Sequence, residues 1–241
     1  MMKINQIISL IKNLEEDYTL LFHDVIGSFI SEITDPDNFD ENSAEVNLLE
    51  LSNKLGENIT NYMIYGATEF FLSNEYPHRI TKTHWNCIDH LLKTQGDSFT
   101  DMDKKYLLGL RDSYMCIYKV ADVHRGKNLT LTNMIESKHK PIIIQGIDSN
   151  QDIEIGDIIG CRVVKVNQEY LLSSVCLVLT SKAVSNAIKM IKQISKMALT
   201  KESLKLYMKI YKDPELMFKK MWAKEIMEQW FLYAREPYTL N

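Results

Sequence analysis

Residues 153–180, IEIGDIIGCRVVKVNQEYLLSSVCLVLT, decide the fold class of this 241-residue chain. Gly156 and Asp157 form a turn signal, and two apolar, β-branched runs follow with the polar residues 167–169 between them. This pattern predicts two neighbouring strands. Most segments before residue 114 and after residue 180 have helical spacing instead, so these strands belong to a β module between two helical regions.

The β module is expected to span residues 114–180. At Tyr114 the period of the apolar residues changes from 3.6 to 2, and about five short strands follow with turn residues between them. Five antiparallel strands in a segment of this length fit a small barrel of the OB or SH3-like kind. We expect Gly156 and Asp157 to set a turn, and Ile158, Cys161 and Val163 to fill the core of the module.

The N-terminal region, residues 1–113, is predicted to be helical. Its first apolar residues follow a heptad-like spacing that predicts one helix to about Ile33; they are Ile4, Ile7, Ile11, Leu14, Tyr18, Leu21, Val25 and Phe29. The turn-forming residues 34–43 end this helix, and a second helix to about Leu72 completes a helical hairpin. Shorter helices are expected at 83–94 and 101–113, the second capped by Thr100.

The C-terminal region, residues 181–241, predicts three more helices, with caps at Ser181, Thr200 and Asp213. The expected fold is therefore α+β: an N-terminal helical hairpin, a small five-stranded antiparallel barrel-like module and C-terminal helices. No linker separates the three regions, so we expect them to form one compact domain.

The composition is that of a globular protein, with 45% hydrophobic and 25% charged residues. No segment resembles a signal peptide, and the longest nearly apolar run, residues 170–179, is too short to cross a bilayer. The four cysteines form no CxxC pair, which favours reduced, structural thiols. We therefore expect a cytoplasmic protein that does not bind membranes.

Charge is distributed unevenly along the chain. Residues 1–100 have a net charge of −10, residues 101–180 are neutral, and residues 181–241 have a net charge of +6. Such asymmetry is a hint of a binding partner. The alternative is that the two ends pack on each other or on a second copy of the chain.

Residues 106–166 resemble a module in a family of uncharacterised bacterial proteins, some of which end in a zinc motif of the SEC-C type. The matching residues are Leu110, Ser113, Ile117, Tyr118, Val120, Val123, Gly126, Leu129, Leu131, Gly156, Asp157, Arg162, Val163 and Val164. The family tends to place an arginine and an aspartate where Thr132 and Asn133 stand, and no cysteine follows Cys176. The resemblance implies a fold module without catalytic residues, and the zinc function does not carry over.

Lysines recur at helical spacing in the C-terminal region. They are Lys189, Lys192 and Lys196 in one predicted helix and Lys201, Lys205, Lys209 and Lys212 in the next. A row of lysines on one helix face is typical of a surface that binds polyanions such as nucleic acids. An ordinary solvated helix face has the same pattern, and the acidic balance of the whole chain favours that interpretation.

The last predicted helix is rich in methionine and aromatic residues on more than one face. Such a helix is buried on two sides or contacts a partner. The candidate interface residues are Met217, Met221, Trp222, Trp230 and Phe231.

Catalytic and metal-binding motifs are weak. His84, Cys87 and His90 lie in HWNCIDH, but His84 and His90 diverge by about 120° on a helix, and a structural zinc site needs four ligands. The acidic loop 35–41 lacks the order of a calcium loop, and no P-loop, dinucleotide-binding or nucleophile-elbow motif is present. We expect no cofactor and no metal.

Three functions follow as hypotheses. The first is a non-enzymatic interaction or scaffold protein that binds a protein partner through the β module and the amphipathic helices. The heptad-like spacing of the first helix favours an oligomer, formed through this N-terminal seam or through the methionine-rich and aromatic last helix. The alternative is a nucleic-acid-binding protein that uses the basic helices. The third is an enzyme whose site is assembled from distant residues such as Asp122, His124 and Arg162.

Overall fold

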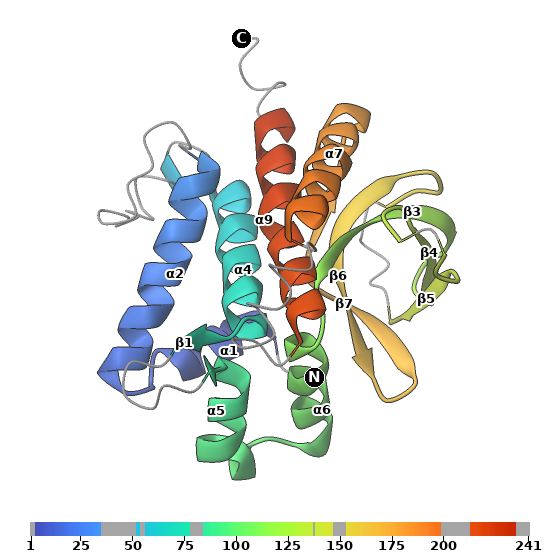
Figure 1. Cartoon of the computed structure of the whole chain (residues 1–241). Coiled ribbons are helices and arrows are strands. Elements are labelled where there is room, and N and C mark those ends of the chain that lie inside the picture. Colours follow the sequence, from blue (N-terminus) through green and yellow to red (C-terminus); the bar gives the residue numbers. More distant parts are fainter. Residues whose placement is uncertain are drawn as a thin grey trace.

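The computed structural model describes residues 3–34, 52–53, 56–77, 84–136, 138–146, 153–198 and 213–234. Helices from both ends of the sequence pack beside a five-stranded, mostly antiparallel sheet that closes in a ring (Figure 1). This arrangement confirms the predicted α+β fold class, with N-terminal helices, a small five-stranded module and C-terminal helices.

The predicted first helix is in fact two helices, α1 (Ile4–Ile11) and α2 (Glu16–Thr34). The turn between them is held by the hydroxyl of Thr19, which lies 3.3 Å from the carbonyl oxygen of Leu14. Glu16 and Asp17 occupy the first turn of α2, where carboxylates interact favourably with the helix dipole. A single helix to Ile33 was therefore the wrong prediction, because the apolar spacing continues across a helix start that the acidic residues favour.

Helix α4 (Glu57–Ser73) packs beside α2, as the predicted hairpin requires (Figure 1). Aromatic side chains form the contact: Phe22 lies against Phe71 with ring centroids 5.2 Å apart, and Phe29 lies against Phe70 at 4.8 Å. Edge-to-face and offset ring pairs of this kind add stability beyond the area that they bury.

A short two-stranded sheet, β1 (Tyr76–Pro77) and β2 (His84–Trp85), precedes α5 (Cys87–Gln95). The helix predicted from residue 83 starts later because Asn86 is its cap, accepting hydrogen bonds from the backbone N–H groups of Ile88 and Asp89. The 3₁₀ turn η1 (Gly96–Ser98) leads to α6 (Asp101–Arg111). The Thr100 cap of α6 is confirmed, since its hydroxyl accepts from the Asp103 N–H at 3.2 Å.

The ring consists of β3 (Met115–His124), β4 (Asn128–Asn133), β5 (Ile142–Gln145), β6 (Ile158–Val166) and β7 (Glu169–Val178). Its order is β3-β4-β5-β7-β6, and β6 pairs with β3 to close it. All neighbours are antiparallel except β5 and β7, which run parallel where Ile144 pairs with Tyr170. The expectation of wholly antiparallel strands was wrong because β7 inserts between β5 and β6.

The turn before β6 follows the prediction. Gly156 has a φ of +98°, a backbone conformation that L side chains rarely adopt, and Asp157 accepts a hydrogen bond from the Glu154 N–H at 2.8 Å. Asn167 has a φ of +58° in the tight turn between β6 and β7. Asparagine tolerates this region better than most residues, which suits it to a two-residue hairpin.

The C-terminal helices described are α7 (Ser181–Ala198) and α9 (Pro214–Ala234). The cap of α7 is Thr180, whose hydroxyl accepts from the Ala183 N–H at 3.2 Å, so the cap stands one residue before the predicted Ser181. Asp213 caps α9 as predicted. The helix expected after Thr200 lies outside the described residues.

Helix α9 occupies the centre of the molecule, between α7 on one side and α2 and α4 on the other, and it also contacts β3 (Figure 1). A continuous hydrophobic core runs from the N-terminal helices through α9 into the ring. None of the helices that the structure describes is long and apolar enough to cross a membrane.

Candidate functional site

An ion pair at the junction of the helices and the ring is fully buried. The side chains of Glu69 on α4 and Arg162 on β6 are 2% and 1% exposed, and Arg162 Nε lies 3.5 Å from Glu69 Oε2. Burial raises the pKa of the Glu69 carboxyl and lowers the pKa of the Arg162 guanidinium, and each charge opposes the shift of the other. Arg162 Nη1 also donates to the carbonyl oxygen of Ser113 at 2.7 Å, so the pair ties α4, β6 and the end of α6 together.

A bulge in β7 explains why a carboxylate is needed there. The register between β6 and β7 shifts between Cys161 and Val163, leaving Arg162 opposite several residues of β7. Two of these residues bind Glu69: the Ser174 N–H donates to Oε1 at 2.8 Å, and the Ser173 hydroxyl donates to Oε2 at 3.0 Å. Glu69 therefore satisfies a backbone donor that the bulge removes from the ladder, and this site is structural rather than catalytic.

A second polar group joins α9 to the ring. Tyr114 and Lys219 both bind the carboxylate of Glu136, Lys219 at 2.9 Å, and Lys219 also lies over the Tyr114 ring. Burial alone would raise the pKa of Glu136, but Tyr114 and Lys219 outweigh it, so the pKa of this carboxyl is lowered. Burial and the carboxylate raise the pKa of the Tyr114 phenol, which therefore stays protonated as a donor.

The described part of the lysine row lies on one exposed face of α7. Lys189, Lys192 and Lys196 are all exposed, and they line an open groove of about 570 Å³. None of the three forms a hydrogen bond or ion pair with any residue that the structure describes. The remaining candidates, Lys201, Lys205, Lys209 and Lys212, lie outside the described residues. Three unneutralised ammonium groups in a row can contact successive phosphates of a polyanion.

No known relative identifies the chain. No family model, curated protein or solved structure matches it. The resemblance of residues 106–166 to a bacterial module therefore stays a prediction, and function must be argued from the residues themselves.

The candidate interface residues on α9 are largely used inside the molecule. Trp222 and Phe231 are buried at 5% and 1% exposure, and Met217, Met221 and Trp230 are half-buried. A partner could contact Trp222 or Phe231 only if the hydrophobic core opened. Of this set, Trp230 lies nearest to an exposed aromatic residue. Its ring packs edge-to-face against the exposed Tyr62, with the ring centroids 5.9 Å apart.

The N-terminal apolar seam is likewise turned inward. Ile4, Ile7, Ile11 and Phe29 are buried, and the others in the seam are half-buried and mostly packed against the core. The heptad-like spacing therefore places the apolar residues of α1 and α2 on the faces that pack against the rest of the same chain. The observation that motivated self-association therefore has an explanation within the fold.

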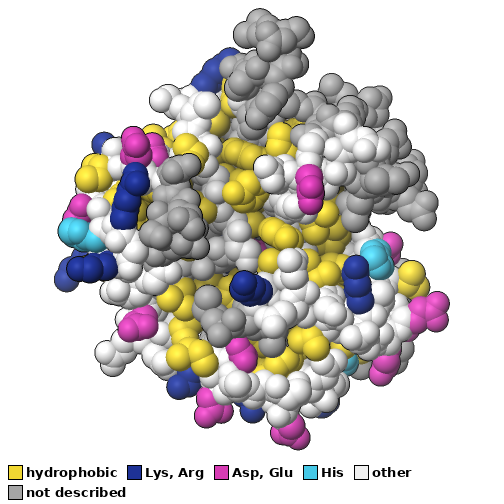
Figure 2. Space-filling model, turned by 180° about the vertical axis from the view of Figure 1, so that it is seen from behind, with side chains coloured by type: hydrophobic (Ala, Val, Ile, Leu, Met, Phe, Trp, Pro, Cys, Tyr) yellow, Lys and Arg dark blue, Asp and Glu magenta, His cyan; other side chains and the backbone are white. Residues whose placement is uncertain are grey.

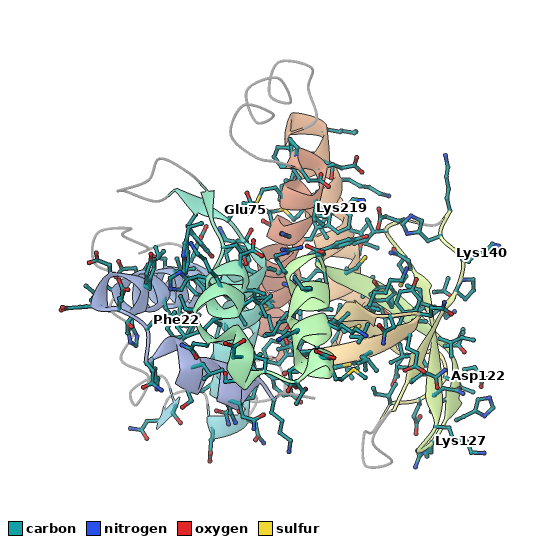
Figure 3. The ribbon with its side chains drawn as sticks, turned by 90° about the horizontal axis from the view of Figure 1, so that it is seen from below. Phe22, Glu75, Asp122, Lys127, Lys140 and Lys219 are labelled. Carbon is teal, nitrogen blue, oxygen red and sulfur yellow. The ribbon has the colours of Figure 1, made fainter. Side chains whose placement is uncertain are left out.

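The structure does not bring the residues of the enzyme hypothesis together. His124 and Asp122 form an exposed ion-pair contact of 3.1 Å at the far end of β3, where Figure 3 places Asp122 on the outer side of the ring. Arg162 pairs in register with Met115 at the other end of β3, roughly 23 Å along the strand from Asp122, and it binds Glu69 instead.

The residues of the histidine and cysteine motif have different surroundings in the structure. Cys87 is buried, and burial raises the pKa of its thiol. His90 packs against the ring of Tyr18, and the side chain of His84 is not described. Across the described ranges, no three His, Cys, Asp or Glu side chains could hold one metal ion.

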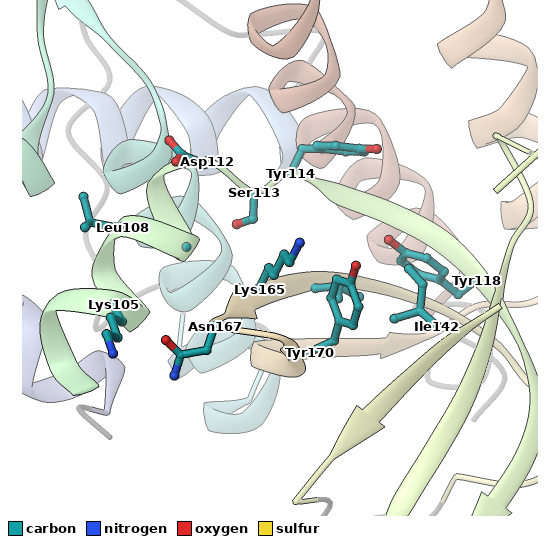
Figure 4. Close-up of a pocket in the computed structure, with 12 residues that line it drawn as sticks. Lys105, Leu108, Asp112, Ser113, Tyr114, Tyr118, Ile142, Lys165, Asn167 and Tyr170 are labelled. Carbon is teal, nitrogen blue, oxygen red and sulfur yellow. The ribbon is translucent and has the colours of Figure 1, made fainter. Parts of the chain in front are cut away.

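Two hollows were not foreseen from the sequence. One, of about 460 Å³, is lined by acidic residues and by Lys220, whose pKa is lowered to about 8 by burial and by the nearby Arg162 charge. Its ammonium donates to the Ser73 carbonyl oxygen, which gives the lysine a structural role at the end of α4. The other, of about 480 Å³, lies between α6 and the ring, and we call it the α6 hollow (Figure 4).

The sequence could not reveal these sites, because each combines residues from distant segments. Tyr118 and Tyr170 come from different strands of the ring, and Lys105 comes from α6. One local signal exists in β6. Its residues alternate between buried and exposed around Lys165, as side chains in a pleated strand do, so this lysine is expected to project away from the core.

Proposed function

We propose that this protein binds a polyanion, with single-stranded nucleic acid as the ligand, through the lysine row on α7. The observation that carries the proposal is that Lys189, Lys192 and Lys196 are exposed on one face and form no ion pair with the described residues. Elsewhere, several exposed charges are paired, as Arg111 is with Asp89 and Asp112. A row of unpaired lysines is the electrostatic footprint that polyanion binding requires.

The residues that line the groove suit a flexible polyanionic strand. The lysines line the groove together with Ser185, Ile188 and Gln193, whose side chains offer hydrogen bonds and an apolar contact. Phosphate contacts of this type carry affinity without reading sequence. The proposal therefore predicts binding that depends strongly on salt and little on base sequence.

The distribution of apolar surface also favours this function over self-association. The α1–α2 seam and most of the α9 methionine and aromatic set are buried in the core. Most of the residues that suggested self-association therefore pack inside the molecule, whereas the α7 lysines are exposed.

Fluorescence anisotropy of a labelled single-stranded oligonucleotide, titrated with the full chain at low salt, tests the proposal. We expect binding by the wild type and a loss of at least about tenfold in the Lys189→Glu/Lys192→Glu/Lys196→Glu variant. The matched control reverses three exposed lysines elsewhere, Lys12, Lys93 and Lys138, so that the net charge changes equally.

Equal losses in the two variants would mean that only net charge matters and would overturn the α7 site. The absence of binding by the wild type at low salt would overturn the function itself. Circular dichroism of each variant must show the wild-type helix content, since these side chains are exposed and their reversal should leave the fold intact.

Protein binding is the second candidate, favoured by the Tyr62–Trp230 pair. Tyr62 is 38% exposed, and Trp230 is the one half-buried tryptophan of the proposed interface set. Figure 2 shows hydrophobic side chains over the middle of one face, with charged side chains around them. If this function holds, Trp230→Ala should weaken self-association or partner binding, which sedimentation velocity over a concentration series measures, while leaving oligonucleotide binding unchanged.

A further inference from the structure

The α6 hollow is a site that the polyanion proposal does not use. It lies beside the point where the backbones of α6 and β6 come into direct contact. A Cβ atom added at Gly109 would lie 2.4 Å from the carbonyl oxygen of Lys165, so only glycine permits this contact. The volume of about 480 Å³ lies in the range of sites that enclose small ligands.

One hydroxyl that lines the hollow has no protein partner among the described residues. Tyr118 is 4% exposed and lines the hollow, yet its hydroxyl forms no hydrogen bond with any described residue. Burial and then the neighbouring Cys116 and Cys161 thiols raise the pKa of Tyr118, so the phenol stays protonated and can donate. The hydroxyl oxygen is open to the hollow, where the acceptor atom of a ligand can replace water as its hydrogen-bond partner.

The charges at the hollow are positive. Lys105 on α6 and Lys165 on β6 line it, both are exposed, and neither forms an ion pair with the described residues. The acidic residue in the lining, Asp112, is engaged by Arg111. In Figure 4 the ammonium of Lys165 and the hydroxyls of Tyr118 and Tyr170 point toward the same space.

The remaining walls are apolar or aromatic. Leu108 comes from α6, and Ile142 and Val163 come from the ring of strands. The ammonium of Lys165 lies over the Tyr170 side chain, 5.9 Å from the centroid of its aromatic ring. An aromatic ring beside an ammonium group is the combination that holds a stacked base next to its phosphate.

We infer that the α6 hollow binds a nucleoside monophosphate. The base stacks on Tyr170, Lys165 binds the phosphate, and Tyr118 donates a hydrogen bond to the ligand. The same chemistry is offered by a free nucleotide and by the phosphorylated end of a strand. This site is separate from the α7 row, because none of its lining residues comes from α7.

Isothermal titration calorimetry of the full chain with AMP and CMP, and with adenosine and cytidine, tests the inference. We expect a nucleotide to bind at about 1 mM or below and its nucleoside to bind at least about tenfold more weakly. Lys165→Gln should weaken nucleotide binding several-fold, and Tyr118→Phe should weaken it while preserving the shape of the site. Lys104→Gln is the matched control, because Lys104 neighbours Lys105 on α6 and does not line the hollow.

Leu108→Trp fills the hollow from a side chain that is 37% exposed, so it should abolish binding without disturbing the core. A 5′-phosphorylated oligonucleotide that displaces AMP would assign the site to a strand end, and failure to displace it would assign it to the free nucleotide. The inference is overturned if no nucleotide binds, if nucleosides bind equally well, or if binding survives Leu108→Trp. The α7 triple variant should bind AMP normally, which separates this result from the polyanion test.

Discussion

Arg162 Nε lies 3.5 Å from the Glu69 carboxylate in a site where both side chains are almost completely shielded from water. The carboxylate also accepts the Ser174 N–H that the β7 bulge leaves outside the ladder. The relationship between these two residues therefore sets how the helices sit against the ring.

Glu69→Ala should lower the free energy of unfolding by about 3–5 kcal/mol, because it leaves the Arg162 charge buried and uncompensated. Urea denaturation measures this loss. Asp89→Ala, which breaks the surface pair with Arg111, should cost less than about 1 kcal/mol. Equal losses would show that the buried pair has no special structural role.

The Glu136 carboxyl should make the free energy of unfolding depend on pH in the acidic range. Its folded-state pKa lies below the ordinary value of 4.5, so its contribution is fully present above that pH and is lost as pH falls through the lowered value. Glu136→Gln should therefore be less stable than the wild type at neutral pH, and the gap should close as pH falls below 4.5 and through the lowered pKa of the Glu136 carboxyl. Denaturation of both proteins across this range is the measurement, and a gap that does not change with pH would refute the assignment.

Gly109→Ala should destabilise the protein by about 1–3 kcal/mol, because the new methyl group would clash with the β6 backbone. Gly96→Ala is the matched control, since its Cβ would meet nothing within 4 Å and its φ is −56°. This second change should be neutral or slightly stabilising. Thermal unfolding of the two variants compares them directly.

The cysteines should differ sharply in reactivity. Cys87, Cys116 and Cys161 are buried, and burial raises their thiol pKa values, that of Cys116 to about 12. Cys176 is half-buried. A thiol reagent at neutral pH should modify Cys176 first and the other three only after unfolding, because the thiolate is the reactive species. Rapid modification of Cys161 in the folded protein would contradict the burial described here.

Local signals predicted the β module well. The predicted limits of β6 match the observed Ile158–Val166, and the turn at Gly156 follows from glycine's freedom at positive φ. Asp213 and Thr100 were also foreseeable caps, because each side chain bonds a backbone N–H only three residues away. Turns and helix caps depend on residues a few positions apart in the chain, so they can be predicted from one sequence.

Long-range relationships escaped prediction. The apolar spacing at Ile4, Ile7 and Ile11 is explained by packing within the chain, since periodicity identifies an apolar face and not what covers it, and self-association stays a prediction. Nothing local indicates that Glu69 meets Arg162, or that Lys105 and Tyr170 line one hollow. For the lysine row, the spacing predicted that Lys189, Lys192 and Lys196 lie on one face of a helix. Only the structure shows that their side chains are exposed and form no ion pair with the described residues.

The salt dependence of single-stranded oligonucleotide binding tests the central claim most directly. Each phosphate contact makes the negative slope of log K against log salt steeper by about 0.7, so neutralising three lysines should make the slope shallower by about 2. We predict this reduction for Lys189→Gln/Lys192→Gln/Lys196→Gln relative to the wild type. An unchanged slope and affinity in that variant would show that the α7 row contacts no phosphates and would contradict the proposed function.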